Sequence, residues 1–141
     1  MSPTDPAPWL LLVAAVHLGF QLTVSLVVYP ALRDVGRDDW ARAHAGHSRR
    51  ITPLVGLLYL PLVIVVVWAA VAKPGPATWA AAAGAAASVL TTALVAAPVH
   101  GRLGDPGPDE RPELHRRLAR ADAVRTAGAL VCVLGALWLL A

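Results

Sequence analysis

Polar residues with catalytic chemistry stand where the apolar segments of this sequence end. The set comprises Tyr29, His100, Asp122 and Arg125. A histidine beside a carboxylate can act as a general base, and a guanidinium can stabilise an enolate or phenolate. The pattern favours His100 as the base, Asp122 as the group that orients it and Arg125 as the oxyanion partner. Tyr29 would complete the catalytic set. The alternative is a simple ion pair, because Asp122 and Arg125 lie three positions apart on one helical face.

Three histidines suggest a second kind of site. His44 and His47 lie three positions apart on a predicted helix, and His100 ends a different apolar segment. Imidazole nitrogens suit Cu, Fe and Zn, so His44, His47 and His100 are the predicted ligands of one such ion. No HExxH or paired CxxC pattern accompanies them. A site that uses no cofactor is therefore the other prediction.

Two further polar residues interrupt the first apolar segment. His17 and Gln21 are one helical turn apart, and polar groups inside a membrane are costly enough to indicate function. Together with Trp40, they are the predicted substrate-binding residues. The alternative for His17 is a neutral side chain that hydrogen-bonds to Gln21 or to a neighbouring helix.

The elements that position these residues are membrane helices. Hydrophobic residues make up 57% of the 141 positions and charged residues 15%, whereas ordinary soluble domains have about 25% charged residues. This composition excludes a soluble enzyme and a disordered tail. A helix needs about 20 apolar residues to cross a bilayer, and four segments approach or exceed that length. We predict one all-α domain over residues 1–141, an integral membrane four-helix bundle with helices at about 8–30, 52–72, 77–99 and 122–140.

The charges orient this bundle. All charged residues except Asp5 and Lys73 lie within 33–50 and 102–125. The positive-inside rule places these two segments in the cytoplasm, so both termini face outward (N-out/C-out). We therefore expect a multi-pass protein of the plasma membrane. The basic loops explain the high pI without nucleic acid, so the predicted partners are the lipid bilayer and a lipophilic small molecule.

The two predicted cytoplasmic loops cover residues 31–51 and 100–121. Within the first loop, one helical face carries an aromatic, two histidines and an aliphatic residue: Trp40, His44, His47 and Ile51. This periodicity predicts a short amphipathic helix that lies along the inner membrane surface. In the second loop, Pro112 suits the first turn of a helix that continues into the last membrane segment.

Three short segments carry a resemblance to a known family. They are Tyr29-Pro-Ala-Leu32, Pro98-Val-His-Gly-Arg-Leu103 and Leu118-Ala-Arg-Ala-Asp-Ala-Val-Arg-Thr126. Their order at the ends of helices 1, 3 and 4 resembles the small four-helix membrane proteins related to fungal anthrone oxygenases, a domain family mostly of unknown function. That family usually has asparagine where this chain has His100 and Asp122. Its proline, leucine, arginine and threonine are kept at Pro98, Leu103, Arg125 and Thr126.

The resemblance implies an oxygenase that inserts oxygen from O2 into an activated aromatic carbon without an evident cofactor. The implied substrate is lipophilic and enolisable and enters from the bilayer. The paired exchange of two asparagines suggests that His100 and Asp122 touch. We therefore expect a membrane-embedded, oxygenase-like oxidoreductase that acts at the inner leaflet.

Two other interpretations stay open. One is a non-enzymatic membrane protein, such as a transporter subunit or an assembly partner. The other is a membrane protein that holds a metal through its histidines. Small residues on the third and fourth helices would serve a homo-oligomer as well as a monomer core.

Overall fold

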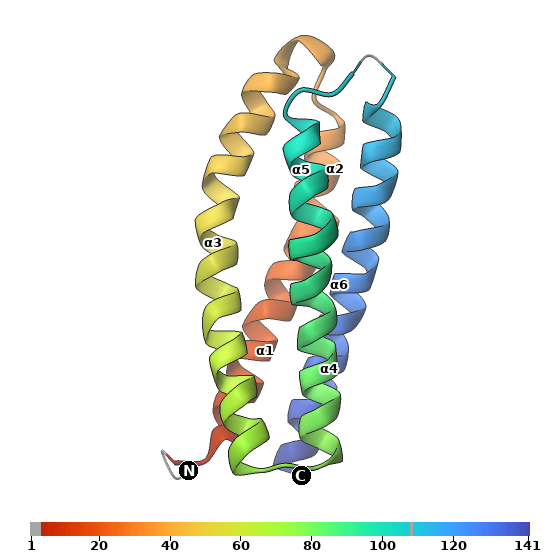
Figure 1. Cartoon of the computed structure of the whole chain (residues 1–141). Helices are drawn as coiled ribbons and strands as arrows, with labels where there is room; N and C mark the ends of the chain where they lie inside the picture. The colour runs from red at the N-terminus through yellow and green to blue at the C-terminus, as the bar shows by residue number, and fades with distance from the viewer. Residues whose placement is uncertain (1–3, 108) are drawn as a thin grey trace.

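The computed structural model describes residues 4–107 and 109–141, and it is built from helices without strands in those ranges. Four helical segments are long and apolar enough to cross a membrane: Pro6–Arg33, Arg37–Ala72, Pro76–Leu103 and Arg111–Leu140. They stand side by side as a bundle (Figure 1). This confirms the predicted all-α four-helix membrane bundle, and the chain is a multi-pass membrane protein.

Two of the four segments are interrupted by π turns and two are continuous. The elements in chain order are α1 (Pro6–Thr23), η1 (Val24–Val28), α2 (Tyr29–Arg33), α3 (Arg37–Ala72), α4 (Pro76–Thr91), η2 (Thr92–Ala96), α5 (Ala97–Leu103) and α6 (Arg111–Leu140). Both chain ends lie at the end of the bundle where α3 turns into α4 (Figure 1). We call this the terminal end, and the opposite end, with the α2–α3 and α5–α6 connections, the charged end.

Each π turn ends two residues before a proline, Pro30 after η1 and Pro98 after η2. A proline has no N–H, and its ring presses on the carbonyl four residues back. That carbonyl lies inside the π turn in both cases, where the wider ring gives it room. The first turn carries an extra residue, so Tyr29 faces the interior although it stands five positions after buried Val24.

Packing around the bundle follows the order α1, α3, α4 and α6, and the closest approach is between α4 and α6. Glycines make that approach feasible. A Cβ on Gly84 would meet the carbonyl oxygen of Gly128 and lie 2.6 Å from the amide nitrogen of Cys132. A Cβ on Gly135 would lie 2.5 Å from the amide nitrogen of Ala81. The small-residue faces therefore bury each other inside one chain.

The separate helix predicted at the membrane surface is wrong. Residues 38–51 are the first turns of α3, which continues unbroken to Ala72. The reason is tertiary packing, because buried Trp40 donates from Nε1 to the carbonyl oxygen of Leu103 at 2.7 Å and so fixes α3 against the end of α5. A helix held in this way stands upright instead of lying on lipid.

The second predicted loop, residues 100–121, is also largely helical. α5 continues to Leu103, and α6 begins at Arg111 with Pro112 in its first turn. The predicted continuity of this helix into the last membrane segment is confirmed. The charged residues therefore stand on helices that rise beyond the apolar spans, which brings them close to one another.

Candidate functional site

The centre of the candidate site is Arg125, which is buried on α6. Its Nη2 donates to the Tyr29 hydroxyl at 2.8 Å and to Oδ1 of Asp122 at 2.9 Å. The second oxygen of Asp122, Oδ2, accepts from the hydroxyl of Ser25 at 2.6 Å. Tyr29 and Ser25 belong to the first membrane segment and Asp122 to the last, so one guanidinium ties the two together.

Tyr29 extends this network towards two histidines. Its hydroxyl oxygen lies 3.4 Å from Nε2 of His100, and Nδ1 of His100 lies 3.5 Å from Nε2 of His44. The rings of His44 and His100 are stacked, with centroids 5.7 Å apart. Because the phenol oxygen accepts from Arg125, its own proton can point to His100. A chain of polar groups thus runs from His44 to Arg125.

The predicted pairing of His100 with Asp122 is wrong. Asp122 is held by Ser25 and Arg125, whereas His100 contacts Tyr29 and His44. Among the described residues, the link between them runs through Tyr29 and Arg125. The inward rotation of Tyr29 by the π turn places a phenol where the sequence suggested a carboxylate.

His47 also lies beside His100, with ring centroids 5.7 Å apart. The three histidines predicted as metal ligands are therefore neighbours. Their arrangement, however, is one of stacked and tilted rings. Within residues 4–107 and 109–141, no group of three His, Cys, Asp or Glu side chains is placed to hold a metal ion. The metal prediction gains no support from this geometry.

A cavity of about 490 Å³ adjoins these residues. Its polar lining includes Tyr29, His44, His47, His100 and Arg125, together with the hydroxyl residues Ser48, Thr52 and Thr92. Apolar and small side chains complete the wall, including Phe20, Val24, Ile51, Val55, Ala96, Ala97 and Gly101. Exposed residues of α3 and α5 also line it, so the cavity opens on the side of the bundle, where α3 stands apart from α5 (Figure 1).

Trp40 does not line this cavity. Its ring is buried between the guanidinium of Arg111, 4.0 Å from the ring centroid, and the stacked ring of His44 at 5.2 Å. The structure therefore uses this predicted substrate-binding residue to position His44.

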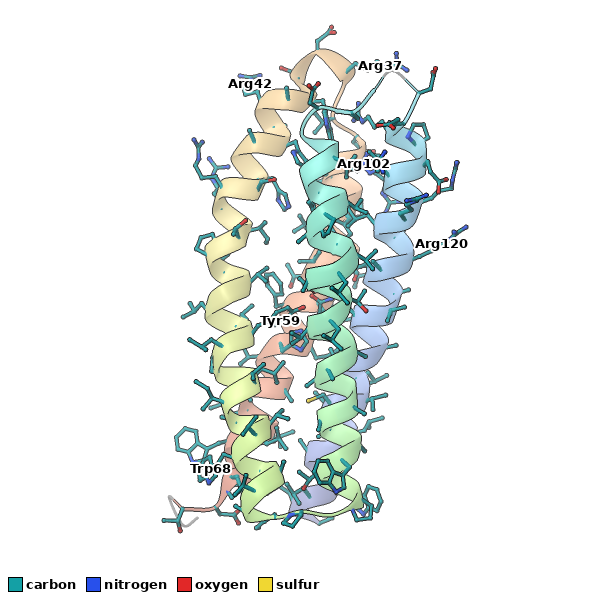
Figure 2. All side chains as sticks on the ribbon, in the orientation of Figure 1. Arg37, Arg42, Tyr59, Trp68, Arg102 and Arg120 are labelled. Atoms are coloured by element: carbon teal, nitrogen blue, oxygen red, sulfur yellow. The ribbon has the colours of Figure 1, made fainter. Side chains whose placement is uncertain are left out.

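His17 and Gln21 lie deeper and do not line the cavity either. Both side chains are completely buried, and all four of their nitrogen and oxygen atoms lack a hydrogen-bond partner among the described residues. The predicted bond between them is not formed. The ring of His17 meets that of Tyr59 edge-on at 5.0 Å. Figure 2 shows Tyr59 at mid-height, between Arg102 near the charged end and Trp68 near the terminal end.

Three contributors to this region were not among the predicted site residues. Ser25 orients Asp122, and the hydroxyl of Tyr59 lies 2.8 Å from that of Thr92, which lines the cavity. The signal for Ser25 was present, because it continues the helical face of His17 and Gln21. Tyr59 carried a weaker signal, because it is a single phenol within a mostly apolar segment.

No family model, curated protein or solved structure matches this chain. The fold and the site define a class, a helical multi-pass membrane protein with a polar cluster beside a lateral cavity. The resemblance to the anthrone-oxygenase-like family stays a prediction.

Proposed function

We propose that the chain is a membrane-embedded oxidoreductase of the oxygenase type, acting on a lipophilic, enolisable small molecule at the inner leaflet. The main support is the cavity of about 490 Å³, which combines apolar walls with a histidine cluster and a buried arginine. Small-molecule sites have volumes of roughly 300–1,000 Å³ and a few convergent polar groups in an apolar lining. The lateral opening between α3 and α5 suits a substrate dissolved in the bilayer.

In this proposal His100 takes a proton from an activated methylene carbon of the substrate. Tyr29 and Arg125, joined by a hydrogen bond of 2.8 Å, stabilise the enolate oxygen, since donors fixed before the reaction cost no reorganisation. His44, 3.5 Å from the second nitrogen of His100, passes the proton outward to the charged end.

The proposed overall reaction converts one methylene group and one molecule of O2 into one carbonyl group and one molecule of water. The deprotonated carbon gives electrons to O2 and a C–O bond forms. The resulting peroxide anion then takes back one proton along the same path through His44 and His100, which gives a hydroperoxide on that carbon. Removal of the second proton from the carbon forms the carbonyl, breaks the O–O bond and releases water. The carbon loses four electrons and O2 gains four, so dioxygen is the sole co-substrate.

Anthrone, a planar tricyclic ketone with an acidic methylene group, is a suitable probe. The test measures O2 consumption and quinone absorbance with the full-length protein in lipid nanodiscs. We expect His100→Ala to lose at least 100-fold in rate, the lower range for loss of a general base. His115→Ala is the matched control, because His115 belongs to the same end of the bundle but does not line the cavity.

Thermal unfolding of each variant separates loss of chemistry from loss of fold. Equal O2 consumption in the wild type and His100→Ala, with both proteins folded, would overturn the catalytic assignment. Binding of anthrone without turnover in the wild type would leave a carrier or binding protein as the remaining interpretation.

A further inference from the structure

A second hollow, of about 690 Å³, lies at the charged end and adjoins the lateral cavity, with which it shares Ala41 and Gly104. It is formed where α2 ends, where α3 and α6 begin, and by residues 104–107. Its wall carries the side chains of Arg33, Arg37 and Arg111. Figure 2 shows Arg37 at the extreme of this end.

The charges in the wall of this hollow are unbalanced. None of its three arginines belongs to an ion pair among the described residues. Three carboxylates of the same end have other partners: Asp39 with Arg42, Glu110 with Arg102, and Glu113 with Arg116 and Arg117. Asp105 is the one carboxylate among the described residues of the wall. Three guanidinium groups and one carboxylate therefore line the hollow, while Asp34 and Asp38, which follow Arg33 and Arg37 in the chain, do not line it.

Two of the three arginines are held in place before any ligand arrives. Arg111 lies over the ring of Trp40 and donates from Nη2 to the carbonyl oxygen of Val35 at 2.8 Å. Arg33 donates from Nε to the carbonyl oxygen of Tyr29 at 3.4 Å. These contacts use part of each guanidinium and leave its other N–H groups for a ligand. Because the side chains are already ordered, a ligand would lose less entropy in engaging them.

The geometry points to a binding site for the phosphate group of an anionic ligand. Guanidinium forks match phosphate oxygens in pairs, and three of them can surround a tetrahedral group. Apolar wall residues, Val35, Ala41 and Pro112, can contact the part of the ligand next to the phosphate. Both a lipid headgroup and free phosphate share this chemistry. The site is separate from the proposed oxidation and does not depend on it.

Ligand binding can be tested on the full-length protein in neutral detergent. Native mass spectrometry and thermal unfolding are followed with three probes: inorganic phosphate, short-chain phosphatidylglycerol and short-chain phosphatidylcholine. We expect phosphatidylglycerol or phosphate to bind and raise the unfolding temperature, and phosphatidylcholine to bind at least tenfold more weakly because its headgroup has no net charge. Binding of phosphatidylglycerol alone assigns a lipid headgroup, and competition by phosphate assigns a soluble ligand.

Arg37→Gln is the informative variant, because Arg37 is exposed and makes no ion pair among the described residues. We expect it to weaken anion binding at least tenfold, and Arg37→Lys to fall between it and the wild type. Arg120→Gln is the matched control, since Arg120 is also exposed but projects from the side of α6, away from the hollow (Figure 2). Equal weakening by Arg37→Gln and Arg120→Gln, or equal binding of all three probes, would overturn the site.

Discussion

Tyr29 and Arg125 stand 96 positions apart in the chain and are joined by a hydrogen bond of 2.8 Å. Both side chains are buried, at 7% and 5% exposure. The bond joins the first membrane segment to the last. Buried polar contacts stabilise a protein when every group has its partner and destabilise it when one partner is removed. The contacts of the candidate site can therefore be tested by measuring the free energy of unfolding of variants.

The pair formed by Asp122 and Arg125 should be strongly coupled. Arg125→Gln leaves a buried carboxylate without its counter-charge, which costs about 3–5 kcal/mol in the free energy of unfolding. Adding Asp122→Asn removes that charge, so the double variant should be less destabilised than the sum of the single variants. The measurement is a double-mutant cycle by denaturant titration in detergent. Additive effects would show that the two side chains do not interact.

Removal of the imidazole of His17 should stabilise the protein. Both ring nitrogens are buried without a partner among the described residues, and each unsatisfied buried group costs about 1–3 kcal/mol. His17→Leu should therefore raise the unfolding temperature, and Gln21→Leu should act in the same direction. A lower unfolding temperature in both variants would contradict this prediction, because it would mean that the two polar side chains make stabilising contacts.

Substitution of glycine by alanine should lower the free energy of unfolding at one position and raise it at another. A Cβ on Gly84 meets the backbone of α6, so Gly84→Ala must separate two helices and should cost about 1–3 kcal/mol. Gly56 has nothing within 4 Å of its added Cβ, so Gly56→Ala should gain about 0.5–1 kcal/mol from helix propensity. Thermal unfolding of the two variants in parallel checks the difference. Equal effects would contradict the close α4–α6 contact.

Filling the lateral cavity should abolish small-molecule binding without unfolding the bundle. Gly101 lines the cavity and has open space around its added Cβ, so Gly101→Trp can place an indole there. Binding of a lipophilic probe such as anthrone is followed by fluorescence, with Gly56→Trp as the control. Unchanged binding in Gly101→Trp would place the ligand elsewhere.

A pH effect is expected at the terminal end, where Asp5 caps α1. Its carboxylate accepts from the amide of Ala7 at 3.0 Å and from Lys73 at 2.9 Å. These contacts, the Ala7 amide first, lower the pKa of Asp5 from its ordinary value of 3.8. The stabilisation is therefore complete above that value and is lost as the pH falls through the lower pKa of the folded state. Unfolding temperatures of the wild type and Asp5→Ala should converge at acidic pH and differ at neutral pH. A difference in unfolding temperature that does not change with pH would contradict the role of the Asp5 carboxylate.

Much of the fold could be predicted from hydropathy and charge. Lipid offers the backbone no hydrogen bonds, so a long apolar segment must form its backbone hydrogen bonds internally, as a helix does. The residues at which those helices end were less predictable, because helix length depends on contacts between distant residues, such as the hydrogen bond from Trp40 to Leu103. Periodicity in one segment contains no information about such a partner.

Most residues of the candidate site could be predicted from the sequence, but the contacts between them were harder to predict. The ion pair between Asp122 and Arg125 follows from their spacing on one helix. The partner of His100 depends on the rotation of Tyr29 by a π turn, and the spacing of an ideal helix places Tyr29 on another face. The prolines after both π turns were the available signal.

The two halves of the chain repeat one plan: α1 with α4, η1 with η2, α2 with α5, and α3 with α6. Among the long helices, α1 stands diagonally across the bundle from α4, and α3 from α6. A chain of half this length, paired with its own copy, could therefore bring the same elements to the same places. Duplication and fusion of one hairpin gene would be enough to generate the bundle. A symmetric dimer would hold two copies of each residue, so the use of Tyr29 from one half and His100 from the other requires that the two halves differ in sequence.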